Sequence, residues 1–203
     1  MSTLENLEFN GGGSNPSGIK PIAYVVLKSQ ITAFPEMATA PASVAEKAGY
    51  KAVSDFTLVK GQKFSTIYST QGVGKIECET SGEDDCQCFT NKLSLKYPDI
   101  DDAGKAYLNS ALNSSLVAVV PHYTKSGVRY AVIGGRDFDA KVTNKANSGD
   151  KPGSAKGIDI EISAPDYMAL PNYNGVIETD KGSLNCATGV FTPAATTPPA
   201  PGV

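Results

Sequence analysis

The chain has 203 residues, of which 40% are hydrophobic, 8% aromatic and 19% charged, with no tryptophan and a formal charge of -3. These values are typical of one globular domain with a mainly aliphatic core. The acidic balance argues against a surface that grips nucleic acid through its phosphates, because such a surface needs a basic face. No window approaches the ~18 apolar residues of a membrane span, and the first residues lack the basic and apolar regions of a secretory signal.

The 20 glycines and 13 prolines predict short strands and turns rather than long helices. We expect an N-terminal arm at residues 1–20, a single β-sandwich domain at residues 21–186 and an extended Pro-rich tail at residues 187–203. A Gly-Gly-Gly-Ser run disfavours regular structure in the arm. Leu7 and Phe9 leave two interpretations of the arm open: a disordered terminus, or a segment that orders against a neighbouring subunit.

Apolar patterns predict the main strands. Residues 22–27 form a nearly continuous apolar run, which is typical of a strand covered on both faces. Residues 86–97 alternate, with Leu93 and Leu95 on one face and lysines on the other. The segment 158–163 alternates strictly, so its isoleucines are expected to face the core and its acids the solvent.

Residues 31–52 interrupt this pattern with a long loop that carries apolar side chains. Ser43 and Glu46 have the spacing of a capping box, which predicts one helical turn at residues 44–48. Two interpretations of the loop are open: it contacts a neighbouring subunit, or it folds over its own sandwich. The subunit-interface candidates of the loop and of the arm are Phe34, Met37, Val44, Leu7 and Phe9.

A single helix is predicted at residues 101–113, where acidic residues lead the segment and suit a helix N-terminus. Its apolar side is expected to consist of Ala103, Tyr107 and Ala111, with Leu108 next to them. One such face is enough to lay the helix on a sheet.

The segment 116–133 reads as two strands joined by a tight turn, and it ends at a Gly-Gly break. A weak strand at residues 138–142 and a polar loop at residues 144–157 are expected to follow. Residues 165–185 are predicted to form a last hairpin, with turns at Asn174-Gly175 and Lys181-Gly182.

A metal site would have to be built from the cysteines and the single histidine, His122. Cys86 and Cys88 are separated by one residue, whereas zinc ligands are generally separated by two to four. We therefore expect no metal site with Cys78 or His122 and no cofactor. A disulfide with Cys186 is disfavoured if the protein assembles in a reducing cytoplasm.

No catalytic motif accompanies these residues. His122 follows Pro121 without a nucleophile elbow, so we interpret it as structural and expect that the protein is not an enzyme. Acidic side chains at residues 77–85 offer the paired carboxylates that a glycosidase needs, but acids at a hairpin tip are more often a solvated surface. In an assembly they would line a channel or lie against lysines of a neighbour. These acids are Glu77, Glu79, Glu83, Asp84 and Asp85.

The order of these elements resembles the tail tube proteins of tailed bacteriophages and of related contractile injection devices. The residues that carry the resemblance are 116–120, 127–130, 133–134 and the alternating segment IDIEIS at 158–163. The resemblance implies a mainly β fold, a sandwich or barrel with one flanking helix. Copies of such proteins, usually six, join into a ring with a continuous inner barrel, and a long early loop reaches the adjoining ring.

The resemblance also implies a function. The protein would be a structural virion protein, located in the phage tail and assembled in the host cytoplasm, and it would form a tail tube or tail ring through which DNA is ejected. Its partners would be its own copies, other tail or connector proteins, and DNA that passes without sequence-specific binding. A channel with few basic residues would keep that DNA unbound. Two alternatives are a head–tail connector or adaptor ring and a monomeric β-sandwich module for adhesion or carbohydrate binding.

Overall fold

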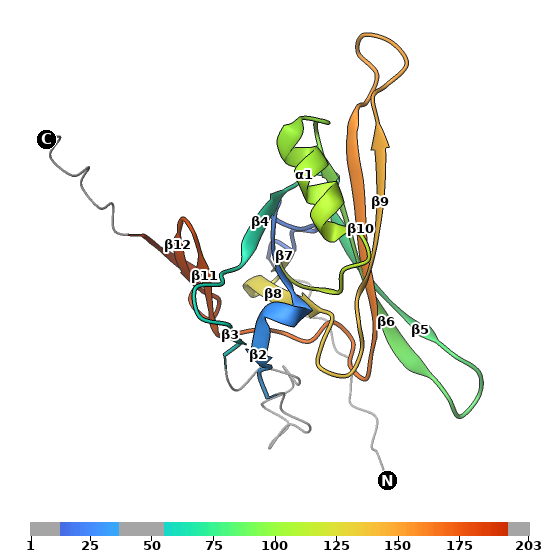
Figure 1. Cartoon of the computed structure of the whole chain (residues 1–203). Coiled ribbons are helices and arrows are strands. Elements are labelled where there is room, and N and C mark those ends of the chain that lie inside the picture. The colour runs from blue at the N-terminus through green and yellow to red at the C-terminus, as the bar shows by residue number, and fades with distance from the viewer. Residues whose placement is uncertain (1–12, 37–54, 195–203) are drawn as a thin grey trace, which may run out of the picture.

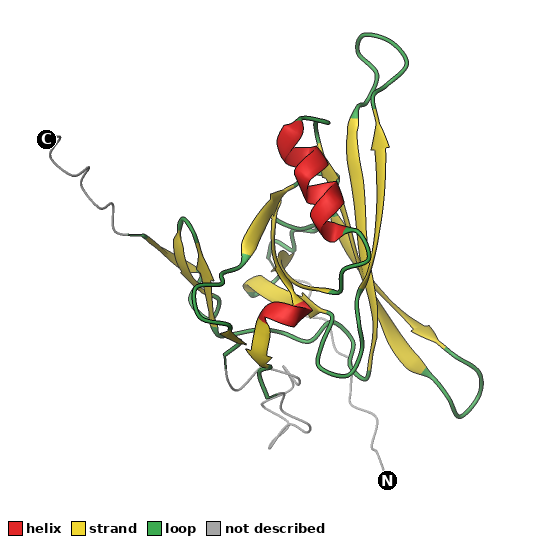
Figure 2. Cartoon of the chain, viewed as in Figure 1, coloured by secondary structure: helices red, strands yellow, loops and turns green. Residues whose placement is uncertain are grey.

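The computed structural model describes residues 13–36 and 55–194. Within these ranges the chain is mainly β, with one α-helix and one short 3-10 helix (Figure 1, Figure 2). The elements are β1 (Ile22–Leu27), η1 (Lys28–Gln30), β2 (Ile31–Ala33), β3 (Thr57–Leu58), β4 (Ser65–Tyr68), β5 (Lys75–Ser81), β6 (Cys88–Tyr97), α1 (Asp102–Ala111), β7 (Leu116–Thr124), β8 (Gly127–Ile133), β9 (Lys141–Asn147), β10 (Gly157–Asp166), β11 (Val176–Thr179), β12 (Gly182–Asn185) and β13 (Val190–Pro193).

The first sheet has the strand order β4-β1-β7-β8 and is antiparallel throughout. Its strand β1 is buried on both faces, because Ala23 and Val25 pack into one apolar cluster while Tyr24 and Val26 pack into another. The two-sided burial predicted for residues 22–27 is therefore confirmed, since a strand without a solvent face has no need of polar alternation.

The second sheet has the order β5-β6-β10-β9, is also antiparallel, and packs face to face on the first. Ile158, Ile160 and Ile162 are buried between the sheets, while Asp159 and Glu161 pair with lysines on the outside. The alternation predicted for β10 is confirmed. The β9–β10 and β5–β6 hairpins extend beyond the sandwich at opposite ends (Figure 1).

The helix α1 lies against one end of the sandwich (Figure 2). Asp101 is its N-cap, with Oδ1 accepting a hydrogen bond from the Gly104 N–H at 2.7 Å. Gly104 and Ala111 are the buried residues of the helix. A Cβ at Gly104 would lie 2.8 Å from Ile158 Cδ1, so the glycine allows close approach to β10. Ala103, expected on the apolar face, is exposed because the helix packs through the next residue instead.

A C-terminal layer covers the other face of the first sheet. Strands β11, β12 and β13 form a three-stranded antiparallel sheet. Tyr173 and Ile177 are fully buried in the second apolar cluster, together with Val117 and Val119 of β7. The first sheet is therefore the middle layer of three, and the second sheet keeps one exposed face.

Three expectations about the C-terminal half were wrong in part. β9 spans Lys141–Asn147, although residues 144–157 were expected to be a loop, because the outward positions of this strand are all polar. The hairpin expected at residues 165–185 is present, and its turn at Asp180-Lys181 lies within one residue of the turn expected at Lys181-Gly182, whereas Asn174-Gly175 precedes β11 and joins no two paired strands. β13 also lies inside the tail expected from residue 187, since it pairs with β12.

The loop expected at residues 31–52 begins with a strand, because Ile31 of β2 pairs with Leu58 of β3. Residues 37–54, including the predicted helical turn, lie outside the described residues, as do residues 1–12 of the arm. In the described part of the arm, Ile19 forms an antiparallel bridge with His122 of β7. The described sheets form a sandwich rather than a closed barrel.

Candidate functional site

The second sheet ends at two open edges. Within the described residues, β5 pairs only with β6, and β9 pairs only with β10. The outer backbone groups of both edge strands therefore lack a partner strand. A row of unpaired N–H and C=O groups is a template for a strand from another chain. These two edges and the outward face between them form the candidate functional site.

Other parts of the chain cover part of each edge of the first sheet. Along β8, the Val132 N–H donates to the Pro171 carbonyl at 2.8 Å, next to an antiparallel bridge between residues 131 and 172. At the start of β4, the Phe64 N–H donates to the Glu178 carbonyl, also at 2.8 Å. Strand addition is therefore blocked at these positions of the first sheet, whereas no strand of the described ranges blocks it along β5 or β9.

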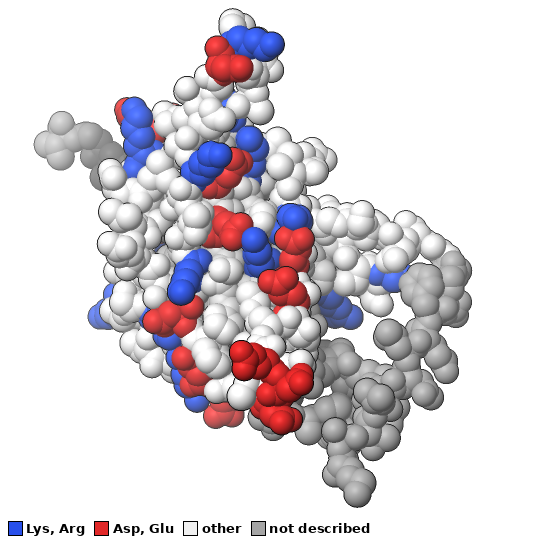
Figure 3. Space-filling model, turned by 90° about the vertical axis from the view of Figure 1, so that its right-hand side faces the viewer, with Lys and Arg blue, Asp and Glu red and all other residues white. Residues whose placement is uncertain are grey.

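The outward face of the second sheet is exposed and charged, with basic and acidic side chains interspersed (Figure 3). Two ion pairs join β6 to β10: Lys92 Nζ lies 2.9 Å from Glu161 Oε2, and Lys96 Nζ lies 3.3 Å from Asp159 Oδ1. The hydrogen bond to Glu161 raises the pKa of Lys92. Each lysine on this part of the face is thus held by a carboxylate of the neighbouring strand.

The two edge strands carry different charges on this face. Lys141 and Lys145 project outwards from β9, because Val142, the neighbour of Lys141, packs against the core and side chains alternate along a strand. Glu77 and Glu79 project outwards from β5 by the same alternation. Glu77 accepts a hydrogen bond from Lys75 at 2.8 Å, which lowers the pKa of the carboxyl group.

Charges of both signs nearly balance on the outward face. Its lysines are Lys75, Lys92, Lys96, Lys141 and Lys145, and its carboxylates are Glu77, Glu79, Asp159 and Glu161. The lysines of this face are therefore accompanied by acids. The acidic residues 83–85 lie in the exposed turn of the β5–β6 hairpin, at one end of the same sheet.

Of the five predicted interface residues, one lies in the described part of the chain. Phe34 is half-buried, and its ring packs edge-to-face on Phe56 with centroids 6.0 Å apart. This phenylalanine therefore packs within its own subunit instead of projecting freely. Leu7, Phe9, Met37 and Val44 lie outside the described residues.

The structure does not bring the cysteines and the histidine together. Cys78 and Cys88 project from opposite faces of the second sheet, whereas Cys186 is buried in the second apolar cluster. His122 lies on β7 of the other sheet, where burial lowers its pKa. All four thiols are free, and the described residues contain no group of three His, Cys, Asp or Glu placed to hold a metal ion.

The opposite charges of the two edges were missed at the level of sequence, because most of β9 was expected to be a loop. A signal was present in the spacing of Lys141 and Lys145, which are four residues apart and therefore share one face of a strand. On β5 the acids were noted as a hairpin-tip cluster, and the structure places two of them on the strand itself.

Comparison with known proteins found no matching family model, no matching curated protein and no matching solved structure. None of the helices in the described residues is long and apolar enough to cross a membrane.

Proposed function

We propose that this chain is a structural protein of a tailed bacteriophage virion, and that its copies join through the second sheet into a tail tube or tail ring. The observation that carries the proposal is the contrast between the sheets: within the described residues, the chain pairs part of each edge of the first sheet with its own backbone and pairs neither outer edge of the second. Exposed edges are an aggregation hazard for a monomer, and closure into a barrel removes them.

The strand directions favour such closure. Because β5, β6, β10 and β9 alternate in direction, β5 and β9 run antiparallel to each other. A rotation that brings β9 of one copy beside β5 of the next therefore creates another antiparallel ladder, with the same pairing as inside the sheet. This is a head-to-tail contact, which generates a closed ring when the rotation closes.

The charges on the outward face favour the same contact. It would place Lys141 and Lys145 of one copy near Glu77 and Glu79 of the next, on the same side of the joined sheet. Opposite charges on adjacent strands contribute roughly 0.2–1 kcal/mol per pair. In this contact, the lysines expected to lie against the acids would belong to β9 of the neighbouring copy.

The outward face of the second sheet would then form the wall of the channel. The opposite face of the first sheet is covered by the C-terminal layer and is unsuited to this role. Lys92 and Lys96 are held by carboxylates of β10, so they offer phosphates little free positive charge. A wall of balanced charge would let DNA pass without retaining it.

The test is the assembly state of the purified full chain, measured by light scattering on a size-exclusion column and by negative-stain imaging at increasing concentration. We expect rings or stacked tubes. Single rings that never stack would favour the connector or adaptor role. A 21.2 kDa monomer that persists at high concentration would contradict the proposal and favour the binding module.

A further inference from the structure

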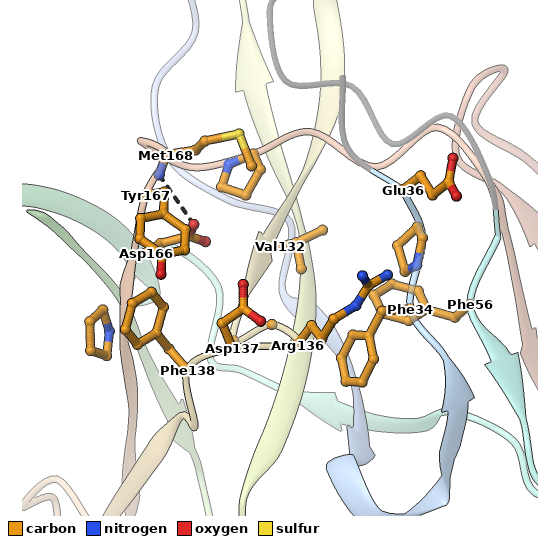
Figure 4. A pocket seen from close by; sticks show the side chains of 15 residues that line it. Phe34, Glu36, Phe56, Val132, Arg136, Asp137, Phe138, Asp166, Tyr167 and Met168 are labelled. Atoms are coloured by element: carbon orange, nitrogen blue, oxygen red, sulfur yellow. Dashed lines mark hydrogen bonds between the residues drawn. The ribbon is translucent and has the colours of Figure 1, made fainter. Parts of the chain in front are cut away.

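A cavity of about 470 Å³ opens between β2, the connection after β8 and the segment after β10 (Figure 4). Its volume lies within the usual range of ligand sites, which is about 300–1,000 Å³. Phe34 and Phe56 border it at one end, and Phe138 and Tyr167 border it at the other. Val132 lies between these two aromatic pairs (Figure 4). We call this cavity the aromatic groove.

Each end of the aromatic groove is a packed pair of rings. Phe34 and Phe56 contact edge-to-face with centroids 6.0 Å apart, and Phe138 and Tyr167 contact with centroids 4.9 Å apart. Tyr167 is nevertheless 68% exposed, so most of its surface is presented to solvent. Aromatic side chains at both ends of a groove, one of them largely exposed, are the kind of surface that binds an extended Pro-rich peptide.

The chain itself contains one segment of that kind. Pro198 and Pro201 are the only two prolines in the sequence that are three residues apart, and Pro199 lies between them. A polyproline II helix has three residues per turn, so two prolines at this spacing share one face, about 9 Å apart. The backbone of this helix forms no internal hydrogen bonds, and its carbonyls remain available as acceptors.

We propose that the aromatic groove binds the Pro198–Pro201 segment of a second copy of this chain. The two prolines would pack on the two aromatic pairs, while the Arg136 guanidinium and the Tyr167 hydroxyl supply hydrogen-bond donors for the peptide carbonyls. The segment from residue 192 to residue 203 has no charged side chain, so packing rather than ion pairing of side chains would hold it.

A second copy is the expected donor because of where the described chain ends. β13 lies at the outer edge of the molecule, away from β2 and from the end of β10 that border the groove (Figure 1). Four residues lead from Ala194 to Pro198, which reach at most about 14 Å. Binding between copies is also independent of the open edges of the second sheet, so this inference does not rest on the proposed function.

The test measures binding of a fluorescent peptide of residues 194–203 by polarisation. The receptor is the full chain with Pro198→Ala and Pro201→Ala, so that its own tail does not compete. We expect saturable binding that is similar at low and high salt. A peptide with both prolines replaced by alanine should bind at least about 10-fold more weakly, as is usual when an interface anchor is removed.

Two variants of the receptor locate the site. Tyr167→Ala should weaken binding at least about 10-fold. Tyr123→Ala, which removes an exposed tyrosine of β7 outside the groove, should leave it unchanged. Failure of the wild-type peptide to bind, equal binding of the two peptides, or equal effects of the two tyrosine variants would overturn the inference. A purely monomeric protein that still binds the peptide would support it while contradicting the proposed ring.

Discussion

Lys145 on β9 and Glu79 on β5 project from the same face of the second sheet, at its two opposite edges. Within one copy, β10 and β6 lie between their strands. In a head-to-tail ring the same two side chains would become neighbours across the junction between copies. The charge of each edge can therefore be changed separately, and the junction can be tested from both sides.

Replacing Lys141 and Lys145 together by glutamate should prevent assembly, because two acidic edges would then face each other at every junction. The fold should survive, since both side chains are exposed. Sedimentation velocity of the wild type and of this variant measures the effect, and we expect the variant to sediment as a monomer at concentrations where the wild type forms rings.

Exchanging the charges of both edges in one chain is the matched control. A variant that also carries Glu77→Lys and Glu79→Lys again presents opposite charges at each junction and should recover assembly. If the variant with only two substitutions assembles like the wild type, the junction lies elsewhere on the subunit, even though rings form.

Asn91 should be a sensitive position for stability. Its fully buried side chain donates from Nδ2 to the Met168 carbonyl at 2.9 Å, and its Oδ1 accepts from the Leu170 N–H at 3.1 Å. Asn91→Ala leaves two backbone groups without these partners, which should cost about 2 kcal/mol of unfolding free energy. Urea denaturation measures the change, and a loss below about 0.5 kcal/mol would mean that water replaces both bonds.

Leu170 provides a comparison in the same segment. Its φ of 45° lies in the left-handed region, which costs a residue with a Cβ about 1–2 kcal/mol. Leu170→Gly relieves this strain but loses some packing and raises the entropy of the unfolded chain. We expect a smaller change in unfolding free energy than for Asn91→Ala, measured in the same urea series.

Tyr107→Phe should leave stability unchanged or raise it by up to about 1 kcal/mol, since the Tyr107 hydroxyl is buried and has no hydrogen-bond partner among the described residues. Burial raises the pKa of Tyr107 to about 12, above its ordinary value of 10.0. The unfolded chain therefore loses this proton first as pH rises. The free energy of unfolding is therefore unaffected by this ionisation below pH 10, and it falls as pH rises from 10 to about 12.

Urea midpoints at pH 9, 10 and 11 check this dependence. The wild type should lose stability over this interval, and Tyr107→Phe should lose less. Tyr130 and Cys186, whose pKa values burial also raises to about 12, remain in both proteins and contribute to the rest of the decline. Identical slopes for the two proteins would show that Tyr107 ionises freely in the folded state.

The cysteines should differ in reactivity. Burial raises the pKa of the Cys186 thiol to about 12, so it carries almost no thiolate at pH 8, and the side chain is inaccessible. Cys86 is exposed. Peptide mass spectrometry after brief treatment with iodoacetamide should find Cys86 modified and Cys186 unmodified, and urea should abolish the difference. Modification of Cys186 in the folded protein would mean that the C-terminal layer opens readily.

The sequence was sufficient where one face of an element is buried and the other is not. The alternation of β10 and the apolar run of β1 report burial directly, and both were confirmed. The acids before α1 correctly marked its N-terminus, but its buried face contains Gly104 in place of Ala103. β9 was largely missed because its outward residues are polar and its inward residues include Asn144 beside Val142. An edge strand can be held by backbone hydrogen bonds to one neighbour, so its side chains do not have to alternate between apolar and polar.

The site could be predicted only in part for a related reason. The acids of β5 were visible in the sequence, but an open edge is a property of the whole sheet and depends on which strands the chain places last. The aromatic groove could not be predicted from the sequence, because only the folded topology brings together the residues around positions 34, 138 and 167.

The even number of strands in the second sheet has a consequence for stoichiometry. Any number of copies joined head to tail would yield an antiparallel barrel, so the hydrogen-bond pattern would place no limit on ring size. The angle between adjacent copies would decide it, through the twist of the sheet and the wedge formed by the layers behind it. A substitution that changes the thickness of those layers could therefore alter the diameter of the ring while leaving every junction chemically the same.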